Sequence, residues 1–184
     1  MLLRCSRMII PVGRRLAIAA VSTAASAICF HGALASALVT RGDDALRCSD
    51  PVRAFAYYER ARRIAPDSTV AADRLAFHLL QRGESPDVLR AISVATRALQ
   101  SVPDDAPLLL DRALAEQRLH AWKSAERDFA LAAHVSHDAR YEQFAGRAAL
   151  HSGDRSRAIA HFRMAHEIDP TFAPAAHALK ELQA

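Results

Sequence analysis

Aromatic residues are scarce in this chain, and several kinds of catalytic motif are missing. Only 6% of the residues are aromatic although half are apolar, and alanine is the dominant apolar residue. β-Sandwiches favour valine, isoleucine, threonine and aromatic residues, so this composition indicates close-packed helices. The sequence has no HExxH zinc motif, no glycine-rich phosphate loop and no GxSxG nucleophile elbow. We therefore expect an all-α protein that is not an enzyme and binds no cofactor.

Cysteines number only three, which excludes an internal disulfide framework if the N-terminal segment is removed. Cys5 and Cys29 lie in that segment, so its cleavage would leave Cys48 alone. Ile28 precedes Cys29 and Arg47 precedes Cys48, so neither cysteine follows the small residues that lipidation needs. We expect Cys48 to be an unpaired structural thiol, with an intermolecular disulfide as the alternative.

Histidines are more frequent, at nine, but they lack the spacing of a metal site. His134 and His137 are three residues apart, whereas His161 and His166 are five apart and would lie on different faces of a helix. Neither pair has a carboxylate or cysteine at a recognisable ligand spacing. We expect histidines of the surface and turns, and no metal site.

Acidic residues are absent before Asp43, and this absence explains the basic isoelectric point. The chain has 24 lysines and arginines and 20 acidic residues. Four of the basic residues lie together at the N-terminal end: Arg4, Arg7, Arg14 and Arg15. The other 20 balance the acidic residues, so positions 38–184 are formally neutral. Nucleic-acid binding needs clustered positive charge on the folded domain, so we expect no nucleic-acid partner.

Charged residues are also missing from residues 16–40. An uncharged apolar run after an arginine-rich start is typical of membrane targeting, with the arginines on the cytoplasmic side. Small residues before Ala35 and Ala37 suit signal peptidase, and moderate hydrophobicity favours cleavage. The run is also long enough to remain as an anchor, since about 20 residues cross a bilayer. An organelle transit peptide is the third alternative.

These features predict that residues 1–37 form a signal peptide or membrane anchor and residues 38–184 a separate domain. We expect that domain to be periplasmic or exported, or held at the inner membrane by residues 16–40.

Columns of similar residues recur through this domain. Two alanine columns and one partly aromatic column share the same successive spacings, each of roughly 34 residues: Ala54, Ala91, Ala125 and Ala158; Ala61, Ala98, Ala132 and Ala165; Tyr58, Ala95, Phe129 and Phe162. A further column contains only small residues: Gly42, Ala76, Ala113 and Gly146. Each unit closes near a turn residue: Pro66, Pro103, His137 and Pro170. Such repetition predicts stacked helical hairpins, because one hairpin cannot bury its apolar face alone.

We predict four units, at about residues 35–68, 69–105, 106–138 and 139–172, followed by a capping helix at 173–184. The small residues would let the two helices of a hairpin approach closely. Phe129 and Phe162 would fill the gap towards the next unit. In the second unit, Ser85 is the expected N-cap and Pro86 the first helical residue of the second helix.

The repeat period of about 34 residues, the small columns and the terminal prolines resemble the tetratricopeptide repeat (TPR) family. The last unit matches the family pattern best: Gly146, Gly153, Asp154, Ala158, Ile159, Phe162, Ala165, Ile168 and Pro170. The resemblance implies a right-handed superhelix of about four hairpins, which binds a protein or peptide partner on its concave face.

In this family the first helix of each unit lines the concave face. The resemblance implies the following lining: Asp73, Phe77, Leu80 and Gln81 in unit two; Pro107, Leu110, Leu114, Gln117 and Arg118 in unit three; Arg140, Gln143, Arg147, Leu150 and His151 in unit four. This groove would be apolar in the middle and basic towards its C-terminal end, which suits a peptide with an apolar anchor and an acidic tail. Taken singly, each of these residues also fits an ordinary solvated helix face.

Two alternatives give the protein a different role. It could be a self-associating assembly factor of the cell envelope, with Cys48 or the convex face at the interface. It could also be a module that regulates a neighbouring enzyme.

Overall fold

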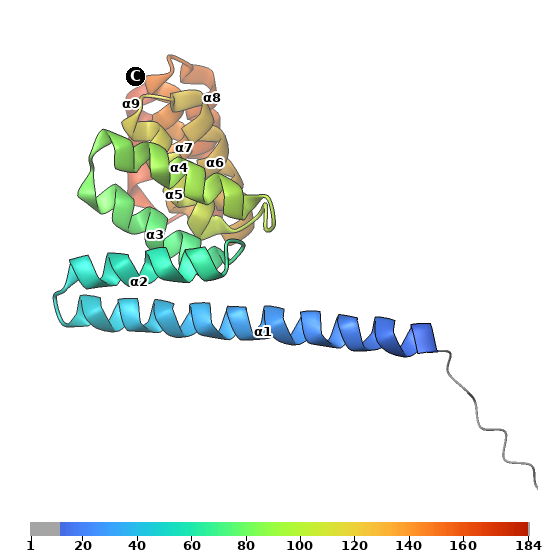
Figure 1. The fold of residues 1–184 in the computed structure, drawn as a ribbon. Coiled ribbons are helices and arrows are strands. Elements are labelled where there is room, and N and C mark those ends of the chain that lie inside the picture. The colour runs from blue at the N-terminus through green and yellow to red at the C-terminus, as the bar shows by residue number, and fades with distance from the viewer. Residues whose placement is uncertain (1–11, 184) are drawn as a thin grey trace, which may run out of the picture.

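The computed structural model describes the backbone of residues 12–183 and the side chains of residues 30–182. Within this range the chain forms nine helices and no strand, which confirms the predicted all-α fold (Figure 1). The helices are α1 (Val12–Arg47), α2 (Pro51–Ile64), α3 (Thr69–Arg82), α4 (Ser85–Leu99), α5 (Ala106–Arg118), α6 (Trp122–Ser136), α7 (Ala139–His151), α8 (Arg155–Ile168) and α9 (Ala173–Gln183).

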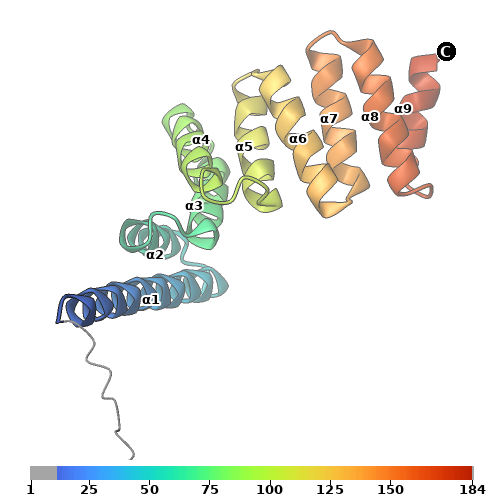
Figure 2. The same ribbon diagram turned by 90° about the vertical axis from the view of Figure 1, so that its right-hand side faces the viewer.

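Consecutive helices pack as hairpins that stack into a solenoid (Figure 2). The hairpins are α1–α2, α3–α4, α5–α6 and α7–α8, and α9 packs against α8 at the end of the stack. The first helices of neighbouring hairpins also touch, as α3 and α5 do. The first helices of the first three hairpins, α1, α3 and α5, therefore lie next to each other.

Side-chain caps fix where most of these helices begin. The N-cap side chains Asp50, Ser68, Asp105, Asp138 and Asp154 each accept a hydrogen bond from a backbone N–H of the first helical turn. These bonds satisfy donors that a helix leaves unpaired at its start.

The α3–α4 turn departs from the prediction. Gly83 ends α3 in the left-handed conformation, with φ of 75°. The N-cap of α4 is Glu84, without a side-chain hydrogen bond, and Ser85 is already helical. The prediction that Ser85 caps this helix is therefore wrong. Pro86 suits the first turn because no intrahelical bond needs its missing N–H there.

Glycine and an aromatic ring meet inside two of the hairpins. A Cβ at Gly42 would lie 2.4 Å from Cε1 of Tyr58, and a Cβ at Gly146 would lie 2.7 Å from Cε1 of Phe162. The small column and the aromatic column therefore face each other directly. Phe162 fills the interior of its own hairpin, and its cluster also contacts the apolar side of α9.

The end of α1 belongs to the core of the first hairpin. Ala35, Leu38, Val39 and Ala45 are buried there, in the same apolar cluster as the buried residues of α2 and α3. The helix extends well beyond α2 on its N-terminal side (Figure 1). Cys48 follows α1 in an exposed turn, as a free thiol.

The predicted N-terminal leader is only partly described. Residues 1–11, including Arg4 and Arg7, lie outside the described residues. Among the helices described, none combines the length and the apolar character needed to cross a membrane.

Candidate peptide-binding site

Four of the predicted concave-face residues meet around one small pocket. The pocket has a volume of about 90 Å³ and lies between α5, the start of α6 and α7. Its lining consists of Leu114, Gln117, Trp122, Phe144, Arg147, Ala148 and His151. Leu114, Gln117, Arg147 and His151 come from the predicted set, and we refer to this pocket as the Trp122 pocket.

Trp122 lines this pocket from the first position of α6, directly after a tight turn. His120 adopts a left-handed backbone conformation, with φ of 58°, and α6 begins two residues later. The Trp122 ring stacks on the His151 ring, with centroids 4.3 Å apart. Both residues also line a second hollow of about 460 Å³, together with His120, Ala121, Lys123, Ser124 and Ser152. The stacked rings thus form a wall between the two spaces.

The architecture is similar to that of TPR proteins of known structure. A crystal structure of MamA superimposes with a TM-score of 0.71 at 16% identity, over 82% of this chain and 81% of that chain. For MamA from Desulfovibrio magneticus RS-1 the TM-score is 0.68 at 18% identity, over 81% and 83%. YrrB, a TPR protein with an unusual peptide-binding site, gives 0.66 at 18% identity, over 89% and 87%.

The chain has the TPR fold. No protein-family model and no curated protein matches the sequence. The helical-repeat superhelix that the resemblance implied is thus confirmed by structure. The Trp122 pocket lies between the first helices α5 and α7 and the start of α6.

Two of the predicted cationic residues are already engaged. Arg118 donates from Nη1 to the carbonyl oxygen of Leu80, which ties α5 to the end of α3. Arg140 donates from Nε to both carboxylate oxygens of Asp138, at 3.0 Å. This hydrogen bonding lowers the pKa of Asp138 and raises the pKa of Arg140. By contrast, Arg147 and Lys123 are exposed beside Trp122, so both are accessible to a ligand.

Other members of the predicted set lie elsewhere. Leu80 is only 3% exposed, so its assignment to the groove surface is wrong. The reason is that it packs into the large core cluster to which α2, α3 and α4 all contribute. Leu110 and Gln143 are half-buried, whereas Pro107 and Leu150 are exposed.

The predicted residues of α3 lie next to a buried carboxyl group. Phe77 is 47% exposed. Asp73 accepts a hydrogen bond from Nη1 of Arg74 at 3.1 Å, and burial raises the pKa of Asp73. Asp111 of α5, absent from the predicted set, is 4% exposed, and burial together with the charge of Asp73 raises its pKa to about 8. At neutral pH the Asp111 carboxyl is therefore mostly protonated and adds little negative charge.

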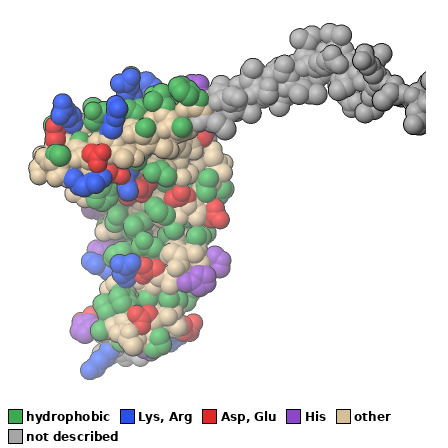
Figure 3. All heavy atoms as spheres, turned by 90° about the horizontal axis from the view of Figure 1, so that it is seen from below, with side chains coloured by type: hydrophobic (Ala, Val, Ile, Leu, Met, Phe, Trp, Pro, Cys, Tyr) green, Lys and Arg blue, Asp and Glu red, His purple; other side chains and the backbone are tan. Residues whose placement is uncertain are grey.

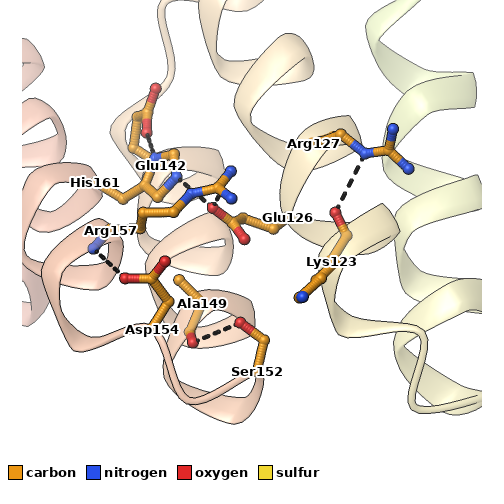
Figure 4. Close-up of polar contacts among 9 residues, drawn as sticks. All are labelled: Lys123, Glu126, Arg127, Glu142, Ala149, Ser152, Asp154, Arg157 and His161. Atoms are coloured by element: carbon orange, nitrogen blue, oxygen red, sulfur yellow. Dashed lines mark hydrogen bonds and ion pairs between the residues drawn. The ribbon is translucent and has the colours of Figure 1, made fainter.

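A buried ionic cluster connects α6, α7 and α8 (Figure 4). His161 of α8 lies between two carboxylates, with Nδ1 2.7 Å from Oε2 of Glu142 and Nε2 3.1 Å from Oε1 of Glu126. Arg157 Nη2 is 2.7 Å from the same Glu126 oxygen. The side chains of Glu126 and Glu142 are 1% and 2% exposed. Its ion pairs and hydrogen bonds therefore link α8 to both α6 and α7.

The environment of His161 contradicts its sequence-based assignment to the surface. Burial acts to lower its pKa, but the hydrogen bonds and charges of Glu142 and Glu126 outweigh burial and raise it. A signal was present: Glu126 and His161 directly adjoin the buried columns of Ala125 and Phe162. Among the described residues, no group of three or more histidine, cysteine or acidic side chains is arranged for a metal ion.

Proposed function

We propose that this protein is an interaction scaffold that binds a peptide segment of a partner protein on the concave face of its repeats. The observation that carries the proposal is the Trp122 pocket, where residues of two repeat units surround one hollow. The likeness to YrrB, a TPR protein with a peptide-binding site, supports it.

The lining favours an apolar side chain next to a carboxylate. Leu114, Phe144 and Trp122 offer apolar walls, and Arg147 offers positive charge. Lys123 adds a second positive charge in the adjoining hollow. The volume of about 90 Å³ is far below the roughly 300–1,000 Å³ of sites for drug-sized ligands. A pocket of this size suits a single side chain of an extended peptide.

Fluorescence of the full-length protein tests this proposal, since Trp122 is the only tryptophan. Two capped peptides serve as probes, acetyl-Leu-Glu-Glu-amide and acetyl-Leu-Lys-Lys-amide. We expect the acidic peptide to change the emission saturably, and Arg147→Gln to weaken its binding about tenfold, or about 1.4 kcal/mol. Arg163→Gln, which changes an exposed arginine of α8, is the matched control. Equal binding by the two variants, or equal binding of the two peptides, would contradict the proposal.

We further propose that the N-terminal segment directs the protein to a membrane, that the repeats lie outside the cytoplasm, and that the segment is retained. Its arginine-rich, acid-free start supports targeting. Burial supports retention: Ala35 is 1% exposed, within an uninterrupted helix. Cleavage after Ala35 or Ala37 would remove this buried residue together with the part of α1 that precedes it.

Two measurements test this location and processing. The first uses a reporter that is active only outside the cytoplasm, fused after Ala184, and we expect this reporter to be active. The intact mass of protein purified from the membrane fraction should correspond to a chain that still contains Ala35 and the preceding residues. A cytoplasmic reporter overturns the location, and a chain beginning at residue 36 or 38 overturns the retention.

A further inference from the structure

A larger pocket lies at the other end of the repeats, between α2 and α3. Its volume is about 430 Å³, and it is lined by Pro51, Val52, Phe55, His78, Gln81 and Arg82. The start of α2 and the last turn of α3 meet here because the two consecutive helices run in opposite directions. None of these residues lines the Trp122 pocket, so the α2–α3 pocket is a separate site.

One wall of the α2–α3 pocket is apolar and open to solvent. Val52 is 80% exposed, and Phe55 is half-buried against the core. Phe77 lies close by at 47% exposure, with its ring 5.7 Å from that of His78 in an edge-to-face arrangement. Exposed apolar side chains that gather around a hollow, rather than lying singly, are typical of binding surfaces.

The pocket is lined by one arginine, Arg82, which is ion-paired with Asp87 but half-exposed. The guanidinium carbon of Arg82 lies 5.2 Å from the Phe55 ring centroid, and its Nε is 3.0 Å from a carboxylate oxygen of Asp87. The Arg82 side chain is 49% exposed, and arginine has five N–H donors. The Nη groups can therefore donate to a further carboxylate. Burial, followed by the charge of Arg74, lowers the pKa of His78, so its imidazole adds no charge at neutral pH.

The surroundings are also basic. Arg90 of α4 lies over the same Phe55 ring, at 6.0 Å, and forms an ion pair with Glu59 of α2. α2 itself carries four arginines and a single glutamate. Figure 3 shows basic side chains interspersed with acidic ones over the α1–α2 end of the molecule. The half-exposed Arg82 guanidinium and the excess of arginine over glutamate on α2 therefore favour a carboxylate ligand.

We propose that the α2–α3 pocket is a second docking site, which binds a partner segment whose apolar side chain is followed by a carboxylate. The apolar side chain contacts Val52 and Phe55, and the carboxylate pairs with Arg82. The volume of about 430 Å³ suits two adjacent residues rather than one. The site does not require occupancy of the Trp122 pocket, so either proposal stands without the other.

Saturation-transfer NMR on the full-length protein tests this site, with empty detergent micelles as the blank. The probes are acetyl-Gly-Leu-Asp-Gly-amide and acetyl-Gly-Leu-Asn-Gly-amide, which differ only in one charge. All samples carry Arg147→Gln, which weakens the Trp122 pocket, and Trp122 emission reports any residual binding there. We expect the aspartate peptide to bind at least fivefold more tightly than the asparagine peptide.

Three variants locate the binding. Val52→Asp should abolish saturation transfer, and Arg82→Gln should make the two peptides equivalent. Leu89→Asp, which changes another exposed apolar residue, 58% exposed on α4, should bind like the parent. Circular dichroism confirms that each variant folds, as expected for surface positions.

Several outcomes would overturn the docking site. They are the absence of saturation transfer to the parent, equal binding by Val52→Asp and Leu89→Asp, or a charge preference that survives Arg82→Gln. Decanoate serves as a further probe: binding of decanoate without either peptide would show a site for free amphiphiles instead of a protein segment.

Discussion

The first and last hairpins of the solenoid share the same glycine–aromatic packing but differ in the polar contacts around the aromatic ring. In both, a glycine of the first helix leaves room for an aromatic ring of the second, Gly42 for Tyr58 and Gly146 for Phe162. Tyr58 carries its own polar group, and its hydroxyl donates to Oδ1 of Asp43 at 2.6 Å. Phe162 has none, and the adjacent His161 makes the polar contacts instead.

This difference shows how one repeat position can link to different neighbours. Asp43 also forms an ion pair with Arg74, with Oδ1 3.2 Å from Nε, and the Tyr58 ring stacks on the His78 ring with centroids 5.2 Å apart. These contacts tie the first hairpin to α3. In the last hairpin, His161 reaches back to α6. The aromatic column thus supplies the packing, while separate residues supply the links between units.

The strongest test of this comparison removes the polar link of the last hairpin. His161→Ala leaves Glu142 buried without its histidine partner and leaves Glu126 with Arg157, so we expect a loss of about 3–5 kcal/mol in the free energy of unfolding. Urea denaturation at pH 6 measures it. His166→Ala, an exposed histidine on the same helix, should change stability by less than about 0.5 kcal/mol. Similar losses in both variants would show that the cluster contributes nothing specific.

The glycine–aromatic packing shared by the two hairpins is tested by adding one methyl group to each glycine. Gly146→Ala and Gly42→Ala should each cost about 1–3 kcal/mol, because the new Cβ would press on a buried ring. In the last hairpin, Phe162→Leu should relieve part of the cost of Gly146→Ala in a double-mutant cycle. Fully additive costs would mean that the ring and the glycine do not share one space.

The histidines next to the two aromatic rings should also respond to pH in opposite directions. They are His161 of the last hairpin and His78 of α3, which stacks on Tyr58 of the first hairpin. His161 has a raised pKa, so its stabilisation is complete below about pH 6.5 and is lost as pH rises through the folded-state pKa. Burial lowers the pKa of His78, so its contribution is present above about pH 6.5 and is lost as pH falls.

Urea titrations between pH 5 and 8 separate the two effects, with His161→Gln and His78→Gln as references. The difference from each reference should change by at most about 1.4 kcal/mol per pH unit, with opposite signs. Slopes of the same sign would refute the assigned environments.

The smallest effect is expected for the polar link of the first hairpin. Tyr58→Phe removes one hydrogen bond but leaves Asp43 paired with Arg74, so we expect a loss of about 1 kcal/mol. Thermal unfolding of the full-length protein measures it, with Tyr57→Phe as the control. A loss as large as that of His161→Ala would erase the proposed difference between the hairpins.

The repeat columns predicted the fold because they record packing directly. Small and aromatic residues recur wherever two helices cross, and that spacing survives in the sequence alone. The buried cluster could not be predicted in this way. His161 and His166 are the same residue type on one helix, yet only His161 meets carboxylates that lie 19 and 35 residues away.

The candidate site shows the same division. The resemblance placed Leu114, Gln117, Arg147 and His151 on one face, and the structure gathers them around Trp122. The resemblance did not reveal that Leu80 is buried, because this burial depends on how α3 packs against the neighbouring helices. The α2–α3 pocket joins the start of one helix to the end of the next, and its lining residues belong to no repeat column.

The continuity of α1 has a mechanical consequence. This helix runs without interruption through 36 residues, or about 54 Å at about 1.5 Å per residue. No break in the helix separates the part that extends beyond α2 from the first hairpin. The extended part of α1 and the solenoid should therefore rotate together. Inserting one residue ahead of Ala35 would rotate the solenoid by about 100° around the α1 axis, relative to the N-terminal end of α1. The number of residues in α1 therefore determines the direction in which the solenoid faces.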